Sequence, residues 1–165
     1  MKSRKSRALA LAVVTLVATA PGAAALAAGW AAYGGIYDTA SEDGHPAELG
    51  LEVRFAALGI PKVALRPAAG IAGTDDGNAW VYGGLRLDLE LGRWVVTPQF
   101  AVTLYDAGDG KDLGGPLEFR SGLEVAYDLA TGPTVGLLFY HLSNGDFYDF
   151  NPGSNSLVLT LAFGR

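Results

Sequence analysis

Apolar and polar residues alternate along most of this 165-residue chain, and this period of two limits the possible folds more than any other feature. In the run AELGLEVRF (47–55), for example, Leu49, Leu51 and Val53 share one face, while Glu52 and Arg54 share the other. The same pattern recurs in GGLRLDLELG (83–92), RWVVTPQFAVTLY (93–105) and PLEFRSGLEVAYDL (116–129). Successive side chains of a β-strand point to opposite faces, so the alternation predicts strands that are apolar on one side only.

Turn signals rich in Gly, Asp, Asn and Pro separate these runs. The longer signals are TASEDGHP (39–46), TDDGN (74–78), DAGDGKDLGG (106–115), ATGP (130–133) and NGDFYDFNPGSN (144–155). Two short segments, GIP (59–61) and GR (92–93), predict tight turns. The signals divide the chain into eight predicted strands, at approximately 29–38, 47–57, 63–73, 78–91, 93–105, 116–129, 133–143 and 156–163. No segment shows helical periodicity.

Two all-β folds fit this pattern. A soluble barrel or sandwich would bury the leucine face, whereas a transmembrane barrel would turn it toward lipid and keep the charges in its lumen. Three features favour the membrane barrel: strands of about ten residues, tight turns that alternate with longer loops, and polar faces that carry both signs of charge. The predicted lumen residues are Glu52, Arg54, Arg66, Arg86, Asp88, Glu90, Glu118, Arg120 and Glu124.

We therefore predict an all-β fold: an eight-stranded antiparallel up-and-down transmembrane β-barrel over residues 28–165. Lipid offers no hydrogen bonds to the backbone, so the sheet must close on itself. With eight strands, side chains fill the interior and leave no pore. In the last strand, Leu157, Leu159, Leu161 and Phe163 share a face and resemble the C-terminal signal read by the barrel-assembly machinery. Such chains usually end on the aromatic residue, whereas here Gly164 and Arg165 follow it.

The first 27 residues have the organisation of a secretory signal peptide. A basic segment with Lys2, Arg4, Lys5 and Arg7 precedes the apolar run 8–20, and Ala25-Leu26-Ala27 fits a small-x-small cleavage site before Ala28. The alternative is an uncleaved membrane anchor, but the apolar run is shorter than the roughly 20 residues of a span. Export through this signal predicts a multi-pass protein of the outer membrane.

Charge and cysteine content exclude some classes of function. Of 12 basic and 17 acidic residues, four basic and no acidic ones lie before the apolar run, so the remainder has 8 against 17, a net charge of −9. Nucleic-acid binding needs basic patches, so we expect none. The chain contains no cysteine and hence no disulfide framework.

The segment FYHLSNGDFYDFNPGSN (139–155) contains the candidate chemistry. His141 and Ser143 lie two residues apart and therefore on one face of a strand. Strand parity turns them outward, and it brings Asn155 of the next strand beside His141. An imidazole can activate a serine hydroxyl for ester hydrolysis if a third group orients it. The pair alone is a weak motif, and hydrogen bonding at the rim of the barrel is the alternative interpretation.

The context of the pair is more specific. LEFRSGLEVAY (117–127), HLSN (141–144) and NPG (151–153), followed by an alternating last strand, resemble the lipid A 3-O-deacylase family of outer-membrane barrels. The resemblance implies removal of an ester-linked acyl chain from lipid A, with Ser143 as nucleophile and His141 as general base. It also implies that Asn151 stabilises the oxyanion and that Asn144 supports the nucleophile.

One position departs from the family. The acid that orients the histidine falls at Asn155, an amide that can accept a hydrogen bond but carries no charge. Asp146 and Asp149, in the following loop, are the candidate replacements for this acid. The chain is thus expected to be a weak deacylase, to recruit one of these aspartates, or to have kept the fold without the activity.

Three functions follow, which differ in location and chemistry. The first is a lipid A esterase of the outer membrane that needs no metal or organic cofactor. The second is a non-enzymatic small barrel, and the third is a soluble exported ligand-binding barrel. The expected partners of the first are lipid A or lipopolysaccharide, the outer membrane and the barrel-assembly machinery, and a homodimer is left open.

Overall fold

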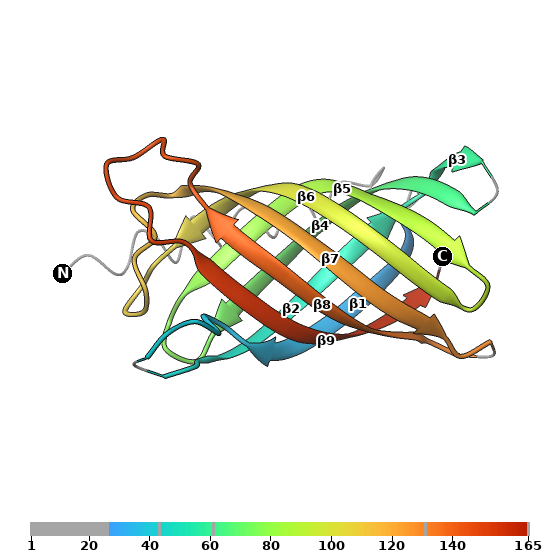
Figure 1. The fold of residues 1–165 in the computed structure, drawn as a ribbon, viewed down its shortest axis with the longest axis horizontal. Helices are drawn as coiled ribbons and strands as arrows, with labels where there is room; N and C mark the ends of the chain where they lie inside the picture. The colour runs from blue at the N-terminus through green and yellow to red at the C-terminus, as the bar shows by residue number, and fades with distance from the viewer. Residues whose placement is uncertain (1–26, 43, 61, 131, 165) are drawn as a thin grey trace.

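The computed structural model describes residues 27–164 except 43, 61 and 131, and these residues form nine β-strands (Figure 1). The strands are β1 (Ala27–Ile36), β2 (Ala47–Phe55), β3 (Leu58–Ile60), β4 (Val63–Thr74), β5 (Ala79–Leu91), β6 (Trp94–Asp106), β7 (Leu117–Asp128), β8 (Thr134–Ser143) and β9 (Ser154–Gly164). Within these residues there is no helix with the length and hydropathy of a membrane span. Residues 1–26 of the predicted signal peptide lie outside the described residues.

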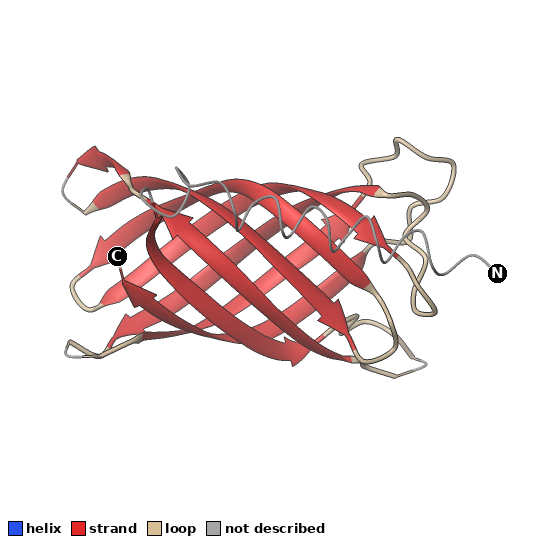
Figure 2. Cartoon of the chain, turned by 180° about the vertical axis from the view of Figure 1, so that it is seen from behind, coloured by secondary structure: helices blue, strands red, loops and turns tan. Residues whose placement is uncertain are grey.

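The strands close into one antiparallel barrel. Its wall has eight strand positions, because β2 and the short β3 share one position beside β4. Each strand from β4 to β9 pairs with the next, β9 pairs with β1, β1 pairs with β2, and β2 pairs with β4. The short β3 pairs only with β4 and continues the line of β2 along that strand. The strands cross the barrel obliquely (Figure 2). The predicted eight-stranded antiparallel barrel is therefore confirmed.

The strand boundaries agree with the prediction to within two residues, with one local difference. The segment GIP (59–61) was predicted to be a tight turn, but the chain is still a strand through Ile60. The register of β3 on β4 pairs Leu58 with Leu65, and the reversal follows at Lys62, which has a φ of 73°. Because β3 and β4 pair up to the reversal, the turn lies one to two residues later in the sequence than predicted.

The two ends of the barrel differ in the length of their connections. The β1–β2, β4–β5, β6–β7 and β8–β9 loops gather at one end, on the left in Figure 1. The turns after β3, β5 and β7 lie at the other end, with the C-terminus. Outer-membrane barrels have long loops on the cell surface and short turns toward the periplasm, so we name these ends the loop end and the turn end.

The wall of the barrel is apolar outside and polar inside. Leu49, Leu159 and Leu123 are 74%, 64% and 48% exposed, whereas Glu52 and Glu124 on the opposite face are buried. Polar side chains alternate with these exposed residues and point into the lumen. The buried charged and tyrosine side chains of the strands are Glu48, Glu52, Arg66, Arg86, Glu118, Arg120, Glu124, Tyr33, Tyr82, Tyr105 and Tyr140. This inverted polarity is that of a barrel solvated by lipid.

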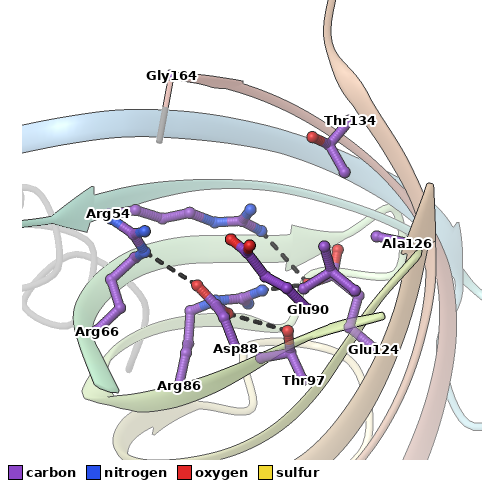
Figure 3. A pocket seen from close by; sticks show the side chains of 11 residues that line it. Arg54, Arg66, Arg86, Asp88, Glu90, Thr97, Glu124, Ala126, Thr134 and Gly164 are labelled. Atoms are coloured by element: carbon purple, nitrogen blue, oxygen red, sulfur yellow. Dashed lines mark hydrogen bonds and ion pairs between the residues drawn. The ribbon is translucent and has the colours of Figure 1, made fainter. Parts of the chain in front are cut away.

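Ion pairs fill the turn end of the lumen (Figure 3). Arg86 binds Glu52 at 3.2 Å and also contacts Glu124, while Arg66 binds Asp88 at 3.0 Å. Arg54 lies 2.8 Å from Glu52. A cavity of about 40 Å³ remains between these side chains, enough for only a few water molecules. This part of the interior is thus packed, as predicted for eight strands.

Arg120 differs from this ion-pair pattern. Its guanidinium lies 3.9 Å from the ring centre of Tyr140 and 4.6 Å from that of Tyr82, and it donates a hydrogen bond to Gln99. Tyrosine faces and an amide therefore hold this buried cation. Room for the third tyrosine nearby, Tyr33, depends on Gly50, because a Cβ there would lie 2.2 Å from the ring.

Aromatic side chains close the loop end of the lumen. Trp80 packs between Tyr37 and Tyr105, with ring centres 5.6 and 5.9 Å away, and the two tyrosine hydroxyls are hydrogen-bonded at 2.9 Å. Leu113, from the β6–β7 loop, is fully buried in this cluster. The cluster anchors the loops that carry the candidate site.

Candidate active site

His141, Ser143 and Asn155 lie on the outer wall of the barrel, at its loop end. His141 is the third-last residue of β8 and pairs directly with Asn155 of β9. On β8 it has the same parity as Leu137 and Phe139, each 48% exposed on the lipid-facing side. His141 and Asn155 are half-buried at the upper edge of this apolar wall. The site therefore opens toward the bilayer and not toward the lumen.

The imidazole of His141 is held by an amide. Its Nδ1 lies 2.9 Å from Oδ1 of Asn155. Since a carbonyl oxygen only accepts, Nδ1 carries the proton, and Nε2 is left with a free lone pair. The backbone carbonyl of Asn155 in turn accepts the N–H of Thr39, at 2.9 Å, from the β1–β2 loop. Asn155 thus occupies the orienting position and sets the tautomer that a general base at Nε2 requires.

Gly153 packs against the other side of the imidazole. It has a φ of 61°, and a Cβ at this position would lie 2.7 Å from Cε1 and 3.1 Å from Nε2 of His141. The sequence identified this glycine only as part of a turn. Its absent side chain gives the imidazole room beside the turn.

Ser143 hydrogen-bonds within its own loop. Its Oγ donates to Oδ1 of Asn151 at 3.2 Å and accepts the N–H of Gly145 at 3.2 Å. The same Oδ1 accepts the backbone N–H of Asn144, also at 3.2 Å. The amide oxygen of Asn151, and not its nitrogen, therefore faces the serine.

Asn144 anchors the β8–β9 loop from the inside of the barrel end. It is fully buried, and its Nδ2 donates to the carbonyl oxygens of Leu113 and Phe150, each at 2.8 Å. Its Oδ1 accepts the N–H of Asp146 at 3.0 Å. Leu113 is remote in sequence, and no local pattern around it predicted this contact. The β6–β7 and β8–β9 loops are thus joined directly beneath Ser143.

Neither candidate replacement acid is hydrogen-bonded to His141 within the described part of the chain. Asp146 accepts from Nδ2 of Asn151 at 2.9 Å. Asp149 is exposed at the outer side of the same loop. The only described partner of His141 Nδ1 is Asn155. Among the described residues, no group of three His, Cys, Asp or Glu side chains is arranged to hold a metal ion.

Aromatic residues form the apolar surface next to Ser143. Phe119 of β7 is the cross-strand partner of Ser143, and its ring lies 5.9 Å from Phe100 and 5.6 Å from Phe147. Phe147 and Phe150, in the loop, are 68% and 57% exposed. A hydroxyl, an imidazole with a free Nε2 and a lipid-exposed apolar surface together suit attack on an ester carried by a membrane lipid.

Comparison with known proteins identifies the family and the fold. A family model described as lipid A 3-O-deacylase (PagL) matches residues 62–164. No curated protein matches. Among solved structures, the outer membrane enzyme PagL is similar with a TM-score of 0.64 and 19% identity, over 84% of this chain and all of that chain. Neisserial surface protein A (NspA) is similar with a TM-score of 0.55 and 10% identity, over 83% of this chain and 96% of that one. The two structural matches share the barrel fold.

Proposed function

Because the chain belongs to the lipid A 3-O-deacylase family, we propose that it removes an ester-linked acyl chain from lipid A in the outer membrane, with Ser143 as nucleophile and His141 as general base. The observation that carries the proposal is the hydrogen bond of 2.9 Å between His141 Nδ1 and Asn155 Oδ1. It leaves Nε2 free as a base on the lipid-facing wall. In this proposal, a bilayer lipid reaches the serine and the base without leaving the membrane.

The reaction begins with the serine hydroxyl. Oγ of Ser143 attacks the ester carbonyl while His141 Nε2 takes the hydroxyl proton, and a tetrahedral oxyanion forms. The C–O bond to the sugar then breaks, and the imidazolium returns the proton to the departing sugar oxygen. Water, deprotonated by the same imidazole, then attacks the acyl-enzyme; the C–O bond to Ser143 breaks, the imidazolium returns the proton to Oγ, and a fatty acid is released. The atoms balance without any cofactor.

Two donors support the oxyanion in this proposal. The N–H of Gly145 already points at Oγ of Ser143, at 3.2 Å. The side-chain amide of Asn151 is the second, and this role requires its Nδ2 to turn toward the serine. Asn144 holds the loop from within through Leu113 and Phe150, so that it positions the nucleophile without touching the substrate.

Targeting follows from the two ends of the chain. The signal peptide exports it, with cleavage before Ala28. The exposed parity of β9, with Leu159 64% and Phe163 36% exposed, presents an apolar C-terminal strand to the barrel-assembly machinery. The protein then spans the outer membrane, with the site in the outer leaflet beside lipopolysaccharide.

Ser143→Ala tests the proposal. Lipid A from cells that express the wild-type protein is expected to lack one ester-linked acyl chain, and mass spectrometry of lipid A from Ser143→Ala cells is expected to show it intact. Loss of the nucleophile lowers the rate by roughly 10⁶-fold in serine hydrolases. Ser121→Ala, on the same wall opposite His141 in register, is the matched control and keeps activity. Deacylation that persists in Ser143→Ala contradicts the nucleophile assignment.

The alternative is a barrel without catalysis, which Asn155 favours because it carries no charge. It predicts identical lipid A from wild-type and Ser143→Ala cells, and no gain from any acid at position 155. A soluble exported barrel would instead appear in the fraction released without detergent.

Gly153→Ala is expected to lower kcat by up to about 10²-fold, since displacement of a catalytic group by about 1 Å has costs of this size. The new methyl group would contact Cε1 and Nε2 of His141. Gly92→Ala is the matched control, because Gly92 has a similar φ of 69° and no atom within 4 Å of an added Cβ. Both variants carry the same backbone strain of about 1 kcal/mol. Equal activities of the two purified variants would show that Gly153 does not position the imidazole.

A further inference from the structure

The orientation of the Asn151 side chain is determined by two neighbours whose hydrogen-bonding roles are fixed. On one side, the backbone N–H of Asn144 can only donate, and it lies 3.2 Å from Oδ1. On the other side, the ionised carboxylate of Asp146 can only accept, and it lies 2.9 Å from Nδ2. Rotation of the amide by 180° would set its oxygen against the carboxylate and its NH2 group against an N–H. Asp146 and Asn144 therefore lock the amide oxygen toward Ser143.

This orientation opposes catalysis in two ways. Ser143 donates its hydroxyl hydrogen to Asn151 Oδ1, whereas attack on an ester requires that hydrogen to go to Nε2 of His141. In addition, Nδ2, the donor atom of the Asn151 side chain, is hydrogen-bonded to Asp146, while the oxygen of the same amide faces the serine. An oxyanion beside Ser143 would face an amide oxygen, which repels it, in place of an N–H that stabilises it.

The backbone at Asp146 is unusual as well. Gly145 and Asp146 both have a φ of 62°. An aspartate therefore occupies a left-handed conformation that glycine and asparagine adopt more readily. The hydrogen bonds to Asn144 Oδ1 and Asn151 hold Asp146 in this conformation. The carboxylate is exposed at the loop surface, and Asn151 is the residue whose side chain it binds.

We propose that Asp146 is a restraining residue, which keeps the site in a resting arrangement by fixing the amide of Asn151 with its oxygen toward Ser143. Catalysis requires release of this contact, so that Asn151 Nδ2 turns to the oxyanion and the Ser143 hydroxyl turns to His141. Asp146 acts through Asn151 and does not touch the reacting atoms. The inference rests on the proposed esterase function and assigns to Asp146 a role opposite to that of a supporting acid.

The test is Asp146→Asn, which keeps the shape of the side chain and suits the left-handed backbone, but no longer dictates the orientation of Asn151. We expect kcat for lipid A deacylation to rise about 10- to 100-fold with little change in KM. One oxyanion donor contributes about 10²–10³ to kcat, and part of this gain is offset by the lost Asn144–Asn151 hydrogen bond. Asp109→Asn is the matched control, since it removes one exposed negative charge from a neighbouring loop and is expected to leave kcat unchanged.

A double variant distinguishes release of Asn151 from a general loosening of the loop as the cause of the higher kcat. If the gain comes from Asn151 as a donor, Asp146→Asn/Asn151→Ala is expected to be no faster than Asn151→Ala alone. A double variant that keeps the gain overturns the proposal, as does an Asp146→Asn variant with the wild-type kcat. A gain shared by Asp109→Asn would identify surface charge as the cause and would also overturn it.

The proposed function and this inference fail in different ways. If Ser143→Ala leaves deacylation intact, or if neither the wild-type protein nor any variant at position 146 or 155 deacylates lipid A, the esterase assignment fails, and with it the proposed role of Asp146. If activity depends on Ser143 but does not respond to Asp146→Asn, the esterase assignment stands and only the restraint is wrong.

Discussion

Asn155→Asp is expected to raise kcat for lipid A deacylation by about 10²- to 10³-fold. In serine hydrolases the reverse change, from aspartate to asparagine, lowers kcat by about 10⁴, in part because the amide imposes the wrong histidine tautomer. Here Oδ1 of Asn155 faces Nδ1 of His141 at 2.9 Å, so the productive tautomer is already present. What Asn155 lacks is the negative charge that stabilises the imidazolium as the proton is transferred, and the expected gain is accordingly smaller than 10⁴.

Two further variants check this explanation. Asn155→Leu removes the hydrogen bond altogether, and we expect it to be slower than the wild type, because nothing then orients the imidazole. The double variant Asn155→Asp/Ser143→Ala is expected to be inactive. Rates would be measured on purified protein with lipid A in detergent micelles. An Asn155→Asp variant no faster than the wild type would show that His141 is not the base, or that the barrel has lost catalysis for another reason.

Arg86→Met is expected to lower the free energy of unfolding by about 3–5 kcal/mol, the cost of breaking a buried ion pair from one side. Arg86 is only 3% exposed and contacts Glu52, Glu124 and Asp88. Without it, Arg54 is the ion-pair partner that remains for both Glu52 and Glu124 among the described residues, so two buried carboxylates share one cation. Methionine fills a similar volume, and the loss is therefore mainly electrostatic.

Urea-induced unfolding in detergent or lipid vesicles measures this loss. Lys111→Met is the matched control. It also removes one cation from an ion pair, with Asp38 at 2.8 Å, but the lysine side chain is 30% exposed, so water reaches this pair and a smaller loss than for Arg86→Met is expected. Equal losses in the two variants would mean that the lumen network contributes no more than this partly exposed pair. The proposed active site lies at the opposite end of the barrel, so kcat of folded Arg86→Met is expected to match the wild type.

Local chemistry in the sequence determined the barrel. The alternation of Leu85, Leu87 and Leu89 with Arg86 and Asp88 assigns each side chain to a face without knowledge of its neighbours, because strand geometry has a period of two. Turn residues likewise act within a few positions. The one boundary that differed, at 59–61, lies where pairing of Leu58 with Leu65 continued the strand. Both faces of the strand 133–143 are apolar, and the larger side chains of the face with His141 and Ser143 predicted that this face points outward.

Only the tertiary structure decided how the polar side chains are used. Asn144 binds Leu113 from another loop, Ser143 donates to Asn151, and the guanidinium of Arg120 packs on tyrosine rings. Asp146 was expected to help His141 if an acid was needed, yet it is hydrogen-bonded to Asn151. Hydrogen bonds depend on distances of a few tenths of an ångström between groups remote in sequence. Periodicity determines the face of a side chain, and three-dimensional packing selects its partner.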